Sequence, residues 1–116
     1  VTDQGAREGN YLESSATALF IYTLAKAVNK GYISKDYIEP TRKAFDGMVK
    51  TFTRLEEDGS YTITNCCAVA GLGGDSKKYR DGSFEYYISE PVIENDPKSV
   101  GSFILAAIEY EKMTDK

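Results

Sequence analysis

Apolar residues gather in three helix-length segments, which are separated by polar stretches that contain glycine. The first segment, residues 11–30, has no charged side chain between Ser14 and Ala25. A helix without a charged face is buried on all sides in a layered helical protein. Gly31 supplies a stop signal, because glycine readily adopts the left-handed conformation that ends helices. The pattern therefore predicts a buried inner helix over residues 11–30.

The second segment, residues 35–53, has a one-sided pattern. Its apolar positions recur three and four residues apart with charged residues between them, which is typical of a helix with one buried face. Ser34 can cap the helix start, whereas Pro40 predicts an irregular first turn. We expect this helix to lie in an outer layer, paired with the inner helix as a hairpin. Its apolar positions are Tyr37, Ile38, Thr41, Ala44, Phe45, Met48, Val49 and Phe52.

Asp96 and Pro97 mark the start of a third helix, over residues 97–112. The Asp side chain can accept hydrogen bonds from the first turn, and Pro at the first helical position gives up none. Residues 99–108 carry no charge, which predicts a second inner helix. If inner and outer helices alternate, residues 3–11 and 89–96 lie together where both inner helices begin. Helix N-termini at that place favour an anionic or strongly hydroxylated ligand.

The connection over residues 55–95 is long and rich in glycine. Connections of this length in compact domains are often functional. Two similar runs, Asp-Gly-Ser-Tyr at residues 58–61 and Asp-Gly-Ser-Phe at residues 81–84, each open a segment suited to extended structure. We expect residues 60–63 and 84–88 to pair as a short β-ribbon. The predicted fold class is therefore mostly α, with a small β-ribbon inside a long loop.

Composition limits the classes of protein that fit. The 116 residues, 41% of them hydrophobic and 28% charged, are enough for one globular domain with a modest core. The net charge of −4 and the scattered lysines and arginines argue against nucleic-acid binding. The longest uncharged run is too short to span a bilayer. The chain begins at Val1 with residues that are typical of the middle of a domain, so we expect a fragment of a longer protein.

Two residue types restrict the chemistry further. Histidine is absent, which excludes Ser-His-Asp and Cys-His nucleophilic sites within this chain and most zinc sites. Cys66 and Cys67 are adjacent and form no disulfide framework, so a reducing compartment fits slightly better than an oxidising one. We interpret both cysteines as small buried residues. The glycines of residues 71–74 lack the Lys-Ser/Thr pair of a phosphate-binding loop, which favours a tight turn.

Several polar residues could line a ligand pocket at the start of the inner helices. Carboxylates such as Glu90 and Glu94 could act as acid and base, as paired carboxylates do in glycosidases, but structural hydrogen bonding at the pocket rim is the stronger interpretation. Tyrosines of the loop could stack on a sugar or simply pack the loop against the helices. Glu13 could face the same rim or serve the helix dipole. The candidate rim residues are Tyr11, Glu13, Tyr79, Arg80, Asp81, Glu90 and Asn95.

The order of these motifs resembles glycoside hydrolase family 105, the unsaturated rhamnogalacturonyl hydrolases, which are related to the unsaturated glucuronyl hydrolases. The resemblance covers nearly the whole chain and rests on several motifs in the same order. These motifs are Gly9-Asn10-Tyr11-Leu12-Glu13-Ser14-Ser15-Ala16, Ala25-Lys26-Ala27 with Lys30-Gly31-Tyr32, Cys67-Ala68-Val69-Ala70-Gly71-Leu72-Gly73-Gly74, Tyr79-Arg80-Asp81-Gly82-Ser83, and the run from Tyr86 to Gly101.

The resemblance implies a six-hairpin α/α barrel, of which this chain forms a single C-terminal segment, about the last third. It also implies hydration of the C4–C5 double bond of an unsaturated uronic acid at the end of an oligosaccharide, without a metal or organic cofactor. In the family an Asp acts as general acid, and no Asp of this chain matches its motif. We therefore expect no catalytic residue here, no hydrolase activity from this chain alone, and a role in the pocket wall.

Three further expectations concern partners and location. The predicted partner is an unsaturated oligosaccharide, with neither nucleic acid nor a membrane. Two inner helices without their barrel neighbours expose apolar faces, so the chain should self-associate. The parent protein could be cytoplasmic or periplasmic in a bacterium. A different class of function stays open, namely a small helical carbohydrate-binding or protein-interaction module, although such a module should give residues 14–25 a polar face.

Overall fold

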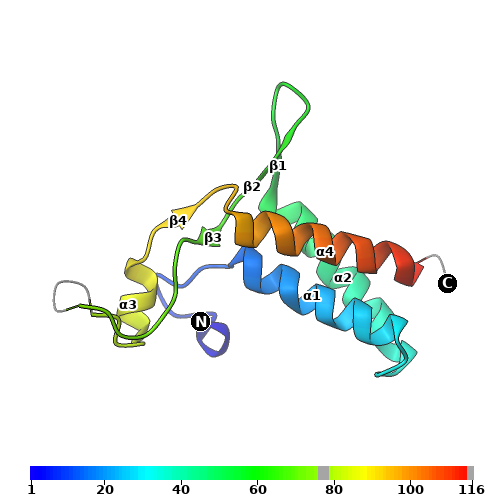
Figure 1. Cartoon of the computed structure of the whole chain (residues 1–116), viewed down its shortest axis with the longest axis horizontal. Helices are drawn as coiled ribbons and strands as arrows, with labels where there is room; N and C mark the ends of the chain where they lie inside the picture. Colours follow the sequence, from blue (N-terminus) through cyan, green and yellow to red (C-terminus); the bar gives the residue numbers. More distant parts are fainter. Residues whose placement is uncertain (76–78, 115–116) are drawn as a thin grey trace.

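A computed structural model of the chain describes residues 1–75 and 79–114. The described chain is mostly helical, as predicted, and three helices form one end of the molecule (Figure 1). A short helix and the N-terminal segment lie at the other end. The elements in chain order are the 3-10 turn Thr2–Gln4, α1 (Ser14–Asn29), the 3-10 turn Lys35–Tyr37, α2 (Ile38–Phe52), β1 (Thr53–Leu55), β2 (Tyr61–Ile63), β3 (Cys66–Cys67), α3 (Phe84–Ser89), β4 (Val92–Ile93) and α4 (Pro97–Thr114).

α1 and α4 lie side by side and run parallel. The hydroxyls of Ser14 and Ser99 hydrogen-bond to each other where the helices begin. At the other end, Asn29 Nδ2 donates to the backbone oxygen of Glu109 at 2.8 Å. Small residues along the seam, such as Ala18, allow this close approach. The prediction that the two uncharged helices begin at the same end is therefore confirmed.

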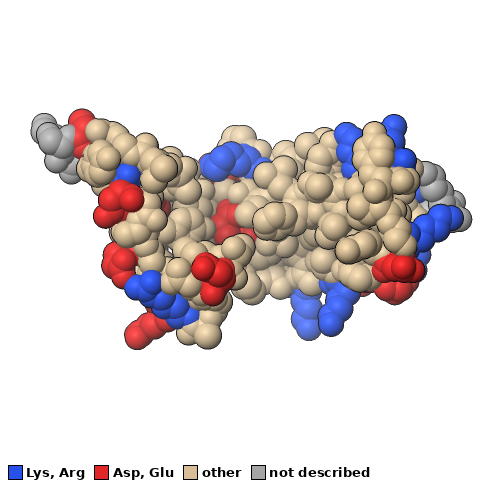
Figure 2. Space-filling model, turned by 90° about the horizontal axis from the view of Figure 1, so that it is seen from below, with Lys and Arg blue, Asp and Glu red and all other residues tan. Residues whose placement is uncertain are grey.

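The outward sides of α1 and α4 are apolar and exposed. Leu19 and Phe20 of α1 are 49% and 60% exposed, and Ile104, Leu105 and Ile108 of α4 are similarly uncovered. Figure 2, which views the molecule from the side on which α1 lies in Figure 1, shows a broad uncharged surface beside a few charged groups near the middle and more at the two ends. Burial on all sides, expected for both helices, does not hold within this chain.

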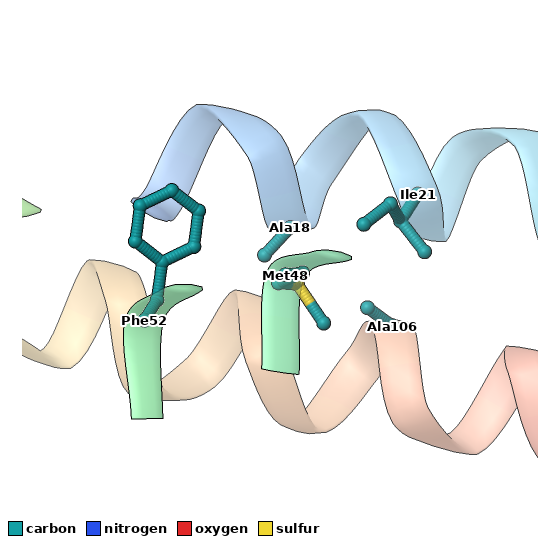
Figure 3. Packing of buried hydrophobic residues seen from close by; sticks show 5 residues of the cluster. All are labelled: Ala18, Ile21, Met48, Phe52 and Ala106. Atoms are coloured by element: carbon teal, nitrogen blue, oxygen red, sulfur yellow. The ribbon is translucent and has the colours of Figure 1, made fainter. Parts of the chain in front are cut away.

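α2 covers the α1–α4 pair and closes the hydrophobic core. Met48 lies between the two helices, and Phe52 packs beside it (Figure 3). Thr41, Met48 and Phe52 of the predicted apolar stripe are buried, whereas Tyr37 and Val49 are 48% and 37% exposed. The prediction of a helix with one buried face is therefore confirmed, with a narrower buried stripe than expected. The first turn is a 3-10 turn ahead of Pro40, capped by Ser34 Oγ at 3.2 Å from the Asp36 N–H. The buried cluster comprises Ala18, Ile21, Met48, Phe52 and Ala106.

The predicted ribbon between residues 60–63 and 84–88 is wrong. β2 pairs antiparallel with β1 instead, with Leu55 opposite Tyr61, and their hairpin projects from the helices (Figure 1). Residues 84–89 form α3, because Ser83 Oγ accepts from the Tyr86 N–H at 3.1 Å and so caps a helix start. α1 also begins at Ser14 and not at residue 11, since Glu13 is its cap.

The loop before α4 is fastened to the hairpin. Asn95 adopts φ of +53° and donates its N–H to Ile63 O at 2.8 Å, while its Oδ1 accepts from the Ile63 N–H at 2.9 Å. Arg54 binds both carboxylate oxygens of Glu94, at 2.8 and 3.0 Å. Asp96 Oδ1 accepts from the Lys98 N–H at 2.8 Å, which confirms the predicted cap of α4. Among the helices described, none has the length and apolar character needed to cross a membrane.

Candidate functional site

Two pockets meet where α1 begins. One, of about 590 Å³, lies between α1, the N-terminal segment and α3, and is lined by Asn10, Tyr11, Glu13 and Tyr87, among others. The second, of about 400 Å³, shares Glu13 and Tyr87 and adds Lys98. Its remaining wall is the short run Cys67, Ala68, Val69 and Ala70 with Ser15 and Ala16. The N-terminal ends of both inner helices therefore border one pocket region, as the alternation of helices predicts.

Tyr11 and Tyr87 form an aromatic wall of this region. Their rings stack with centroids 5.7 Å apart and planes inclined by 11°. The Tyr11 hydroxyl is buried and has no hydrogen-bond partner among the described residues. Burial, followed by the proximity of Cys67 and Tyr87, raises the pKa of the Tyr11 phenol far above its ordinary value. Tyr11 is thus a neutral phenol that can stack or donate a hydrogen bond.

Glu13 is held by structural hydrogen bonds. Its carboxylate accepts from the Ala16 N–H at 2.7 Å, which caps α1, and from the Ser15 hydroxyl at 2.9 Å. The same group accepts from the Cys67 N–H at 3.0 Å and so anchors the pocket loop to the helix start. This carboxylate shapes the pocket wall and is poorly placed to serve as a free acid or base.

We predict that Glu13→Ala lowers the free energy of unfolding by about 2–3 kcal/mol, because it removes a helix cap and leaves the buried Cys67 N–H without its acceptor. Urea unfolding followed by circular dichroism measures the change. Glu57→Ala, at an exposed carboxylate of the β1–β2 turn, is the matched control and should stay within about 0.5 kcal/mol of the parent. Equal stabilities of the two variants would contradict the anchoring role.

Lys98 is a pocket residue that the sequence analysis missed. Its Nζ donates to Asp96 Oδ1 at 2.7 Å and to Ala68 O at 3.1 Å. An ammonium has three donors, so these two contacts orient the group and leave one N–H for a ligand. The sequence did carry one signal of a special role for Lys98: it is a cation in the first turn of a helix, where the macrodipole disfavours positive charge.

The other candidate rim residues line neither pocket. Tyr79 is 67% exposed. Asp81 accepts from the Ser83 N–H at 2.9 Å, and the Ser83 hydroxyl, followed by this N–H, lowers the pKa of Asp81. Arg80 and the buried Glu90 lie beside α3 with 3.8 Å between Nε and Oε1. Asn95 fastens the loop to the hairpin, as described above. Of the seven candidates, Tyr11 and Glu13 come together at the pocket. Tyr87, which is not among the seven but is one of the loop tyrosines considered for stacking, joins them.

No group of three or more His, Cys, Asp or Glu side chains in residues 1–75 and 79–114 is placed to hold a metal ion. Cys66 and Cys67 are both buried and unbridged, as interpreted from the sequence. The site is therefore composed of two stacked tyrosines, a tethered carboxylate, an oriented ammonium and a wall of small residues.

The fold is thus a pair of parallel helices, α1 and α4, covered by α2, with a pocket region where α1 and α4 begin. The sequence profile of Glycosyl Hydrolase Family 88 matches residues 1–114, and the chain belongs to this family. This match, together with the solved relative described below, confirms the resemblance to family 105 at the coarser level of glycoside hydrolase families 88 and 105.

Individual relatives agree with this assignment. "Protein Atu3128" of Agrobacterium fabrum and the "24.9 kDa protein in picA locus" of Rhizobium radiobacter are each 38% identical over an alignment of 113 residues, and each match covers 94% of this chain. The chain spans 48% of the length of each of these curated relatives. A solved glycoside hydrolase from family 105, of C. acetobutylicum ATCC 824, superposes with a TM-score of 0.92 and 46% identity. That match covers 96% of this chain and 30% of the solved one.

Proposed function

We propose that this chain is the C-terminal part of a longer hydrolase that removes unsaturated uronic acid from rhamnogalacturonan-derived oligosaccharides. The observation that carries the proposal is the pocket at the parallel starts of α1 and α4, in a chain that belongs to Glycosyl Hydrolase Family 88. Stacked tyrosines and an oriented ammonium are groups suited to a hydroxylated ring. The pectin-derived substrate and the reaction come from the resemblance to family 105.

The proposed parent fold is a six-hairpin α/α barrel. Two observations support it: the chain matches 30% of the solved relative, and the outward sides of α1 and α4 are apolar and uncovered. In such a barrel further inner helices would cover both sides. The alternative of a free-standing carbohydrate-binding or interaction module fits less well, because Leu19 and Phe20 give α1 an apolar outer face where a module should have a polar one.

The proposed reaction is hydration of the C4–C5 double bond. An acid protonates C4 of the vinyl ether, water adds at C5, and the resulting hemiketal opens to release the next sugar. Glu13 and Asp96 are engaged in helix caps, so neither is free to act as that acid. We assign the general acid to an Asp outside this chain, and to Tyr11, Tyr87 and Lys98 the role of the wall that contacts the sugar.

Two measurements test the proposal. The chain alone should leave the ultraviolet absorbance of an unsaturated rhamnogalacturonan disaccharide unchanged, because the acid is missing. The longer protein that contains this chain should remove that absorbance steadily and release the neutral sugar. Steady loss of the double bond with the purified chain alone would refute the assignment of the acid. A longer protein that leaves the disaccharide intact would refute the substrate.

A further inference from the structure

α3 bears the pocket residue Tyr87 and contacts the N-terminal segment with one of its sides. Tyr87 stacks on Tyr11, and the Arg7 guanidinium lies over the Phe84 ring at 3.8 Å from its centroid. Arg7 also pairs with Glu85. A Cβ on Gly9 would lie 3.0 Å from Ile88 Cδ1, so the segment and α3 pack closely. Small movements of α3 therefore reach the aromatic wall directly.

A second set of contacts ties α3 to the glycine-rich loop. Glu90 immediately follows α3, and its side chain is 0% exposed. Arg80 Nε lies 3.8 Å from Glu90 Oε1, and the backbones of Arg80 and Gly73 exchange hydrogen bonds of 2.8 and 2.9 Å. The Gly71 N–H donates to the Tyr86 hydroxyl at 3.2 Å. Burial, followed by the neighbouring Glu90, raises the pKa of the Tyr86 phenol.

Arg80 and Glu90 lie on opposite sides of α3 in the sequence. Arg80 precedes α3 and Glu90 ends it, so the ion pair joins the two ends of the segment that carries Tyr87. Neither residue lines the two pockets. We propose that Arg80 and Glu90 are positioning residues, whose buried contact closes this segment and thereby holds Tyr87 against Tyr11 in the pocket wall.

The physical reason is the cost of a buried charge. A carboxylate removed from water depends on nearby positive charge and donors, so loss of the Arg80 guanidinium drives Glu90 toward solvent. Glu90→Gln acts differently, because it removes the negative charge that attracts Arg80 and so releases the two ends of the segment from each other. The Glu90 N–H donates to the Tyr87 backbone oxygen at 3.2 Å at the end of α3, so an outward movement of Glu90 displaces this helix end. Tyr87 lies three residues before Glu90 on this short helix and moves with it. The stacking partner Tyr11 sits on a different segment, so the ring contact reports the displacement.

The test uses Arg80→Met and Glu90→Gln in the 116-residue chain, with ring-to-ring nuclear Overhauser effects and the alkaline titration of labelled tyrosines as readouts. In the parent, Tyr11 should stay un-ionised across the accessible alkaline range, because burial and Tyr87 raise its pKa. Both variants should lose the Tyr11–Tyr87 ring contacts, and Tyr11 should begin to ionise near the ordinary phenol range. Glu90→Gln keeps the side-chain shape and carries the test if Arg80→Met does not fold.

Two further variants separate positioning from general stability. Arg80→Lys restores a cation beside Glu90 and should recover the ring contacts at least in part. Arg42→Met removes an exposed arginine that pairs with Glu39 at 2.7 Å on α2, and it should leave the tyrosines unchanged. The proposal is overturned if Arg80→Met and Glu90→Gln are folded by circular dichroism and keep both the Tyr11–Tyr87 contacts and an un-ionised Tyr11.

The consequence for substrate rests on the proposed function. In the longer hydrolase, Arg80→Met should raise KM for the unsaturated oligosaccharide several-fold more than it lowers kcat, and Arg80→Lys should reverse part of the effect. If the longer protein had no hydrolase activity, the proposed function would be refuted. The positioning role of Arg80 and Glu90 would still be tested independently by the Tyr11–Tyr87 ring contacts. An unchanged KM together with lost ring contacts would show that Tyr87 does not contact the substrate and would overturn this last step.

Discussion

Met48→Ala should lower the free energy of unfolding by about 2–5 kcal/mol, the range for truncating a fully buried methionine. Met48 is 1% exposed and lies between α1 and α4 at the centre of the buried cluster. The cavity would be large because the backbones of the surrounding helices are held by Ser14 and Ser99 and cannot close over it. Chemical denaturation at low protein concentration measures the loss.

Val49→Ala is the control for this substitution. Val49 is the next residue of α2 and is 37% exposed, so its truncation removes little buried surface and should change stability by less than about 0.5 kcal/mol. A Met48→Ala chain as stable as the Val49→Ala chain would show that α2 does not close the core against both inner helices.

The second large effect concerns association. We expect the purified chain to form oligomers in a concentration-dependent way and the double variant Phe20→Lys/Ile104→Lys to be monomeric. Leu19 and Phe20 of α1 are 49% and 60% exposed, and Ile104 and Ile108 of α4 are 54% and 44% exposed. Exposed aliphatic surface of this kind drives association in water. Sedimentation velocity over a range of concentrations measures the distribution of species.

The arrangement of the two apolar sides makes the prediction specific. The two sides belong to different helices, so a contact between the α1 side of one copy and the α4 side of another joins unlike surfaces and leaves one side of each copy uncovered. Contacts of this kind produce rings or open chains more readily than a closed pair. Leu55→Lys, at a 62% exposed leucine on β1, is the control and should leave the distribution unchanged. A parent chain that remains a monomer at high concentration would contradict the prediction.

Hydrophobic periodicity found the three long helices because each has one dominant pattern over many residues. The predicted starts of α1 and α2 are each three residues too early. Local hydrogen bonds, such as the cap by Glu13 and the turn before Pro40, determine where these helices begin, and hydrophobic periodicity does not show them. The predicted β-ribbon between residues 60–63 and 84–88 is wrong because the two Asp-Gly-Ser runs have different structural roles. The first run, around Gly59, forms the turn of the β1–β2 hairpin. In the second run, Ser83 caps the start of α3.

The candidate site was only partly predictable for a related reason. Tyr11 and Glu13 lie beside the start of α1, so helix geometry places them at the pocket. Tyr79, Arg80 and Asp81 belong to a loop whose path depends on contacts distant in sequence, such as the Arg80–Glu90 pair. Lys98 could not be recognised as a pocket residue from the sequence, because a helical pattern does not show that its side chain contacts Ala68 O.

The parallel course of α1 and α4 sets the order in which the chain can assemble. The hydroxyl contact between Ser14 and Ser99 closes a loop across 85 residues, whereas α1 and α2 meet across one short turn. Loop-closure entropy and a high contact order delay distant pairings relative to local ones. We infer that the α1–α2 hairpin forms first. Until α4 packs against it, the side of α1 with the small residues of the seam stays exposed. During synthesis, which proceeds from the N-terminus, that seam stays exposed until α4 has been added.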